Sequence, residues 1–140
     1  MSRHHSACMM DSITRLLNYS MGWQGRAGER MAYYLVRAKP RQERLRELEK
    51  LLMERAFEGL RPFGQALSAG LAGARVGADG LALWEEEDYC SPPLAMERAA
   101  VLDSYFDDIQ VEAVMPGEGW RRIQEMPRLF PTVPVQSTED

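Results

Sequence analysis

An amphipathic segment from Arg41 to Glu58 constrains the fold most strongly. Pro40 suits the first turn of a helix, Gly59 is typical of the position just beyond a helix end, and Pro62 prevents continuation. The apolar side chains recur at helical spacing and form one stripe: Leu45, Leu48, Leu51, Leu52 and Ala56. Such a helix depends on packing its stripe against another element, so the chain must supply a sheet or a second helix to cover it.

Three other segments are expected to form strands. Residues 33–38 begin with Tyr-Tyr-Leu-Val, and aromatic and β-branched residues are typical of strands. Successive side chains of a strand point to opposite faces, so the odd-numbered residues of this segment share one face and the even-numbered residues share the other. Residues 81–89 follow the turn at Asp79-Gly80 and begin with Leu-Ala-Leu-Trp, which predicts a second strand. Residues 109–115 alternate between more and less apolar side chains, which predicts a third.

Residues 66–75 fit two structures. Ala66, Gly70 and Ala74 are four apart, as small residues are on a closely packed helix. The same residues also fit a strand weakened by glycine. The following Asp79-Gly80 pair is a strong hairpin signal and would join such a strand to residues 81–89. We therefore favour the strand.

A second helix is predicted after residue 90. Ser91 can cap it, Pro92 occupies the favoured first position, and Asp107 and Asp108 end it. The order of elements is then strand, helix, strand, strand, helix, strand. This order predicts an α+β, ferredoxin-like βαββαβ domain with an antiparallel sheet and both helices on one face.

The chain divides into three parts. Residues 1–30 form an N-terminal extension with a short helix, residues 31–115 form the α+β domain, and residues 116–140 form an irregular C-terminal tail rich in Gly and Pro. Met31 directly precedes the patterned region, so a start of the native protein at Met31 stays open. Trp120 and the pair Leu129-Phe130 are expected to pack the tail on the body of the domain.

The second face of this sheet would be bare. Exposed apolar area of that size normally finds a partner, which predicts a homodimer formed face to face. The residues expected there are Tyr33 or Tyr34, Leu35 or Val36, and Leu83 or Trp84.

The segment from Tyr33-Tyr34-Leu35-Val36 to Val111-Glu112-Ala113-Val114 resembles the dimeric α+β barrel superfamily in its order of elements. That superfamily includes small YCII-related proteins and antibiotic-biosynthesis monooxygenases. YCII-related proteins are associated with a histidine and an aspartate near the barrel pocket. The central region of this chain contains no histidine, so that chemistry transfers to none of its residues.

Charge and composition exclude several classes of partner. The net charge is −4, and the first 30 residues are net basic, so the acidity lies in residues 31–140. A nucleic-acid-binding surface needs the opposite sign, and the acidic strand 81–89 also lacks an RNA-binding signature. No apolar run is long enough for a membrane span or a signal peptide. We expect a cytoplasmic protein with Cys8 and Cys90 reduced.

Catalysis and ligand binding are both compatible with strand 81–89. Glu85 and Glu87 follow Leu81 and Leu83 on the same face, so in an apolar pocket one carboxylate could transfer protons. In the alternative, the strand simply leaves the core at Glu85. The residues expected to shape a ligand pocket are Tyr33, Leu35 and Trp84.

No motif predicts a cofactor or a metal. Phosphate-binding glycine loops and the calcium-loop pattern are absent, and the compact set His4, His5 and Cys8 lacks a completing ligand pair. Cys90 has no nearby histidine in the sequence that could activate it. Two hypotheses remain: a homodimeric domain that binds a small ligand or acts in assembly, and a cofactor-independent enzyme for a small molecule that uses a pocket carboxylate.

Overall fold

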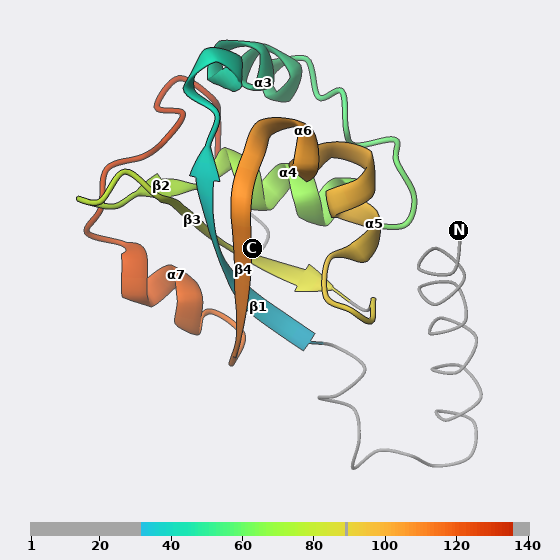
Figure 1. Ribbon diagram of the computed structural model, residues 1–140, viewed down its shortest axis with the longest axis vertical. Helices are drawn as coiled ribbons and strands as arrows, with labels where there is room; N and C mark the ends of the chain where they lie inside the picture. Colours follow the sequence, from blue (N-terminus) through green and yellow to red (C-terminus); the bar gives the residue numbers. More distant parts are fainter. Residues whose placement is uncertain (1–31, 89, 136–140) are drawn as a thin grey trace.

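The computed structural model describes residues 32–88 and 90–135, which form an α+β fold (Figure 1). Within these ranges, antiparallel strands form one sheet in the order β2-β3-β1-β4. The strands are β1 (Ala32–Pro40), β2 (Arg75–Val76), β3 (Ala82–Asp88) and β4 (Phe106–Val114). The predicted α+β class and antiparallel sheet are confirmed.

Helices follow β1, β3 and β4. The first connection contains the 3-10 turn η2 (Gln42–Arg44) and the helices α3 (Leu45–Met53) and α4 (Gly64–Ala72). The second contains α5 (Ala95–Glu97), the π-helical turn η3 (Arg98–Leu102) and α6 (Asp103–Tyr105), and α7 (Glu118–Ile123) follows β4. The predicted helix over 41–58 is therefore present but shorter. It ends before Arg55, whose φ of 59° is incompatible with a right-handed helix.

The main core lies between the sheet and the helices of the two connections. Val36, Ala38 and Trp84 of the sheet pack there against buried leucines of the helices. The Trp84 and Phe106 rings lie 5.2 Å apart between centroids, in a tilted arrangement. The helical contribution comes from Leu48, Leu52, Leu67, Leu71 and Leu102.

The strand expected over residues 66–75 is wrong, because this segment forms α4 and only Arg75–Val76 forms β2. The spacing of small residues was the correct signal. Leu67 and Leu71, one helical turn apart, are fully buried in the core. Gly70 allows the helix to approach the sheet, since a Cβ there would lie 2.8 Å from Cδ1 of Trp84. The Asp79-Gly80 turn is present, with Gly80 at a φ of 85°, but it joins only the short β2 to β3.

This close approach gives a testable consequence for Gly70. We expect Gly70→Ala to lower the free energy of unfolding by about 1 to 2 kcal/mol, because overpacking against Trp84 outweighs the better helix propensity of alanine. Gly59→Ala is the control, since a Cβ at Gly59 meets nothing within 4 Å. Urea denaturation measures both variants. Equal stability of the two would contradict the close packing of α4 on β3.

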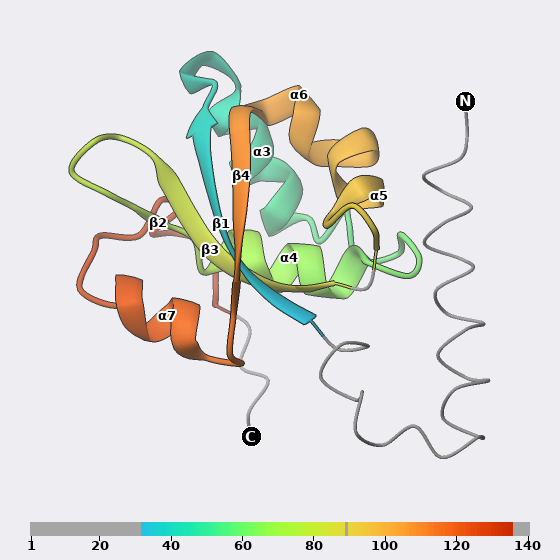
Figure 2. The same ribbon diagram turned by 60° about the horizontal axis from the view of Figure 1, so that its bottom comes forward.

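The second face of the sheet is partly covered, contrary to the expectation that this face is bare. α7 lies on the side of the sheet opposite α5 and α6 (Figure 2). Leu35 and Leu83 are buried there against Ile123, with Trp120 and Met126 packed around them. The apolar residues expected to form a dimer interface thus contact the chain's own C-terminal segment. The segment was predicted to be irregular because it is rich in Gly and Pro.

The rest of the C-terminal segment packs along α4 and β2. Leu129 donates its backbone N–H to the carbonyl of Ala74 at 2.8 Å, and Val76 donates to the carbonyl of Pro127 at 2.9 Å. Phe130 belongs to the main core. The prediction that Trp120 and Leu129-Phe130 pack on the body is confirmed.

The second helical connection differs from its prediction at both ends. The Ser91–Pro92 peptide bond is cis and helix α5 begins only at Ala95, after Leu94 at a φ of 63°. Asp107 and Asp108 lie inside β4, which starts at Phe106. These aspartates are exposed on an edge strand, and Asp108, at a φ of 54°, coincides with a shift in the register between β4 and β1.

Several predictions lie outside the described residues. They are the short N-terminal helix, the status of Met31 and the set His4, His5 and Cys8. Within the described part of the chain, no helix is long and apolar enough to cross a bilayer.

Candidate functional site

Four consecutive acids on β3 divide between the two faces of the sheet. Strand alternation places Glu85 and Glu87 on the α7 side with Leu83, as predicted, and places Glu86 and Asp88 on the side of the main core with Trp84. The two pairs have different partners.

Glu85 connects β3 to the start of α7. One carboxylate oxygen, Oε2, accepts the backbone N–H of Gly117 at 2.8 Å, and Oε1 accepts those of Gly119 at 2.8 Å and Trp120 at 3.2 Å. The first N–H groups of a helix have no acceptor within the helix, and Glu85 accepts these three. Glu85 therefore positions α7, and proton transfer by Glu85 stays a prediction.

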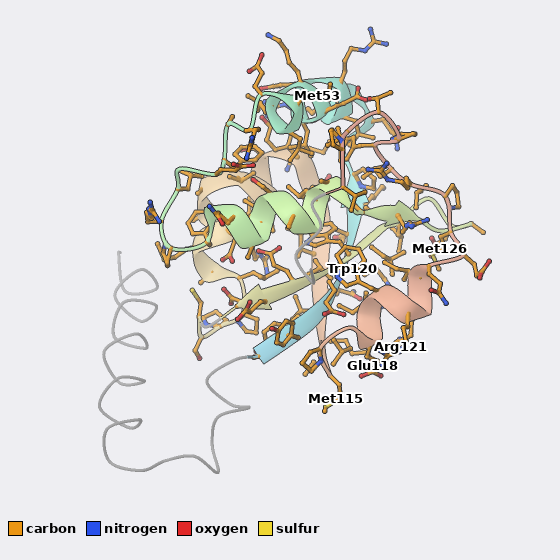
Figure 3. The ribbon with its side chains drawn as sticks, turned by 180° about the vertical axis from the view of Figure 1, so that it is seen from behind. Met53, Met115, Glu118, Trp120, Arg121 and Met126 are labelled. Atoms are coloured by element: carbon orange, nitrogen blue, oxygen red, sulfur yellow. The ribbon has the colours of Figure 1, made fainter. Side chains whose placement is uncertain are left out.

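A cavity of about 320 Å³ lies beside β3, between α4 and Trp120. Figure 3 shows Trp120 extending from α7 toward α4, where its ring would be 3.0 Å from a Cβ at Gly73. The cavity brings together Tyr33, Glu85 and Glu87 from the predicted site. Leu35 and Trp84 do not line it, because both are buried in the cores. The remaining walls are Gln65, Ala66, Ala69, Gly70, Glu86 and Trp120.

Tyr33 contributes a phenol to this cavity. Partial burial raises the pKa of the Tyr33 hydroxyl above its ordinary value, and the negative charges of Glu87 and Glu85 raise it further. The hydroxyl therefore stays protonated at neutral pH. It can donate a hydrogen bond as well as accept one.

On the opposite face, Glu86 and Asp88 meet Glu97 of α5. All three side chains are buried, and Glu97 is fully inaccessible to solvent. Two members are held in place by neighbouring donors. The indole Nε1 of Trp84 donates to Oε1 of Glu86 at 2.9 Å, and Oδ2 of Asp88 accepts the backbone N–H of Leu94 at 2.6 Å. We call Glu86, Asp88 and Glu97 the acid cluster.

The acid cluster has too few hydrogen-bond donors. Among the described residues, no N–H or O–H group donates to either oxygen of Glu97 or to Oε2 of Glu86. The carboxyl groups of Glu86 and Asp88 lie within hydrogen-bonding reach of Glu97, but two carboxylates can hydrogen bond only if one carries a proton. Without a cation beside it, the acid cluster must retain at least one proton.

The pKa values reflect this arrangement. Burial raises the pKa of Glu86 to about 7, with a further rise from the charge of Asp88, while the hydrogen bonds from Glu97 and Trp84 lower it. Burial also raises the pKa of Glu97 to about 11, together with the charges of Glu86 and Asp88. At neutral pH the metal-free cluster holds at least one proton, most firmly on Glu97.

Sequence reasoning missed Glu86, Asp88 and Glu97 as a group. One signal was available, because Glu97 follows Leu94 by three residues and precedes Val101 by four. These two residues lie on the apolar stripe of the second predicted helix. A glutamate on such a stripe is buried when the helix packs, so it needs a partner in the core.

Cys90 lies beside the acid cluster. Its sulfur and one oxygen each of Asp88 and Glu97 lie within 4.8 Å of one another. Cys90 is half-buried and disulfide-bonded, so the expectation of a reduced thiol is wrong for this residue. Cys8 lies outside the described residues. A disulfide sulfur is not a thiolate, which leaves the carboxylates as the ionisable ligands at this place.

Comparisons with family models, curated proteins and solved structures find no match to this chain. The cavity and the acid cluster meet at Glu86, which lines the cavity and belongs to the cluster. Function therefore has to be inferred from these two features.

Proposed function

We propose that this domain binds a small organic molecule in the cavity beside β3. The observation that carries this proposal is a half-open cavity of about 320 Å³, lined by aromatic and polar side chains from separate elements. This volume is near the lower end for small-molecule sites, and a mixture of apolar walls with a few polar groups is typical of them. Tyr33 of β1, Gln65 of α4 and Trp120 of α7 supply three of the walls.

The lining indicates the chemistry of the ligand. Trp120 and Tyr33 offer ring surfaces for stacking, while Glu87 and Gln65 offer oxygen acceptors. No lysine, arginine or histidine lines the cavity among the described residues. The ligand we propose has a flat apolar part and carries N–H or O–H donors or a positive charge.

Access to the cavity follows from the short β2. β2 pairs only with Ala82 and Leu83, so the outer edge of β3 from Trp84 onward has no strand partner among the described residues. α4 lies along this edge instead. Its small residues Ala66, Ala69 and Gly70 leave room there that larger side chains would fill.

Benzylamine and benzoate test this proposal as matched probes, since they share a ring and differ in charge. We expect benzylamine to shift the amide NMR signals of Ala69, Gly70 and Trp120 at millimolar concentration, and benzoate to shift them less. Ala66→Trp fills the cavity and should abolish these shifts. Ala99→Trp, at an exposed position of η3, is the control and should preserve them.

Two results would contradict the proposal. One is the absence of shifts at these amides with either probe. The other is an equal response of Ala66→Trp and Ala99→Trp, which would place binding elsewhere. A preference for benzoate would retain the cavity as a site but refute the proposed ligand charge.

The ferredoxin-like arrangement belongs to the same proposal. The sheet order β2-β3-β1-β4 supports it, together with helical connections after β1 and after β3. In this interpretation α7 is an addition on the second face. A face-to-face homodimer of the dimeric α+β barrel kind would require α7 to leave Leu35 and Leu83, so any homodimer of the intact chain would use a different surface.

A further inference from the structure

We infer that the acid cluster binds a divalent cation through the carboxylates of Glu86, Asp88 and Glu97. Glu97 is fully buried and has no donor to either oxygen among the described residues. Oε2 of Glu86 is in the same situation. Neither glutamate forms an ion pair with a described lysine or arginine. A bound cation would satisfy all three oxygens at once.

The spacing of the oxygens fits a single ion. One oxygen of Asp88 and one of Glu97 lie within 4.8 Å of each other, and Glu86 lies within hydrogen-bonding reach of Glu97. Oxygen ligands stand about 2.0 to 2.6 Å from magnesium or calcium, so two ligands of one ion are separated by at most about 5 Å. The three carboxylates can therefore converge on one ion with small side-chain rotations.

Two of the three ligands are already oriented. The Trp84 indole holds one oxygen of Glu86 and leaves the other available. The backbone N–H groups of Cys90 and Leu94 both donate to Oδ2 of Asp88, at 3.1 and 2.6 Å. Hydrogen bonds from neighbouring donors to the ligand side chains are typical of metal sites, where they fix the orientation of the ligands.

The ligand set selects the class of metal. Carboxylate oxygens suit magnesium, calcium and manganese, whereas zinc and copper favour imidazole and thiolate. No histidine lies among the described residues, and Cys90 is disulfide-bonded. The favoured ion is thus a hard divalent cation, for which Mn²⁺ is a suitable spectroscopic probe. Binding of the ion and binding of benzylamine are measured separately, so a failure of one leaves the other standing.

The test titrates Mn²⁺ into the full chain after treatment with EDTA and follows free Mn²⁺ by electron paramagnetic resonance. We expect one site per chain, with competition by Ca²⁺ or Mg²⁺. Glu97→Gln removes one ligand while preserving shape and should weaken binding at least about tenfold. Glu43→Gln, which removes an exposed glutamate, is the matched control and should leave the affinity unchanged.

Circular dichroism of each variant shows whether the fold is retained. If Glu97→Gln does not fold, Asp88→Asn replaces it, because asparagine can still accept the two backbone N–H groups through its oxygen. If the wild type binds no Mn²⁺ at millimolar concentration, the inference is overturned. Equal Mn²⁺ affinity in the wild type and a folded cluster variant would also overturn it, since the ion would then bind at the surface.

Discussion

Glu85→Ala is expected to lower the free energy of unfolding by about 2 to 4 kcal/mol. The substitution removes the carboxylate that accepts three backbone N–H groups at the start of α7. Charge-assisted hydrogen bonds are stronger than neutral ones, and buried donors left without an acceptor cost additional free energy. Chemical denaturation followed by circular dichroism measures the change.

Glu112→Ala provides the matched control for Glu85→Ala. Glu112 also connects the sheet to α7, through an exposed ion pair with Arg122 at 2.8 Å. Exposed ion pairs contribute at most about 1 kcal/mol, so this variant should be close to the wild type. Glu85→Ala should also self-associate more in sedimentation experiments, because displacement of α7 exposes Leu35 and Leu83. Similar losses in both variants would refute the anchoring role of Glu85.

Without divalent cations, the protein is expected to be about 6 kcal/mol less stable at pH 8 than at pH 5. The pKa of Glu86 is about 7 and that of Glu97 about 11 in the folded chain, against 4.5 as the ordinary value. Between pH 4.5 and the folded-state pKa of each group, the unfolded chain has released the proton of that group while the folded chain still holds it. Rising pH therefore favours unfolding, by about 1.4 kcal/mol per pH unit for each such group. The stabilisation that comes from protonated Glu86 and Glu97 is fully present below pH 4.5 and is lost progressively as the pH rises above it.

Glu97→Gln tests the origin of this pH dependence. Glutamine is neutral at every pH and keeps the shape of a protonated glutamate, so about half of the slope between pH 5 and pH 8 should disappear. Glu43→Gln, at an exposed site, should retain the wild-type slope. Urea midpoints across this pH range, in the presence of EDTA, provide the measurement. A wild-type protein that becomes more stable as the pH rises would contradict the description of the acid cluster.

Regular patterns in the sequence predicted much of the fold correctly. Aromatic and β-branched residues located β1, the apolar run after the Asp79-Gly80 turn located β3, and alternation located β4. The two-residue period of a strand also assigned Glu85 and Glu87 to the face of Leu83. The amphipathic stripe located α3. These predictions succeeded because the period of apolar residues follows directly from which side of an element is buried.

Other parts depended on contacts between distant segments. α4 carries glycine and alanine where a typical amphipathic helix has larger side chains, and its fit becomes evident only beside Trp84. α7 is six residues long, and its start is held by Glu85, more than thirty residues earlier in the chain. Local propensity contains no information about either contact.

The candidate site was predicted in part for the same reason. Tyr33, Glu85 and Glu87 do meet at the cavity, since they share one face of adjacent strands. The acid cluster needs the second helical connection to cross the sheet at Asp88 and to direct Glu97 inward. Its position is fixed by the loop between β3 and α5, in which Leu94 donates to Asp88.

The central claim is that Glu86, Asp88 and Glu97 form one buried cluster in which carboxyl groups share protons in the absence of metal. The most direct test follows the side-chain carboxyl ¹³C signals of the EDTA-treated protein during a pH titration, with Glu86→Gln and Glu97→Gln used for assignment. We predict that the Glu97 signal keeps its protonated position at pH 7.5 and that the Glu86 signal changes near pH 7. Titration of both groups near their ordinary pKa of 4.5 would show that water reaches them, and would contradict this description of the site.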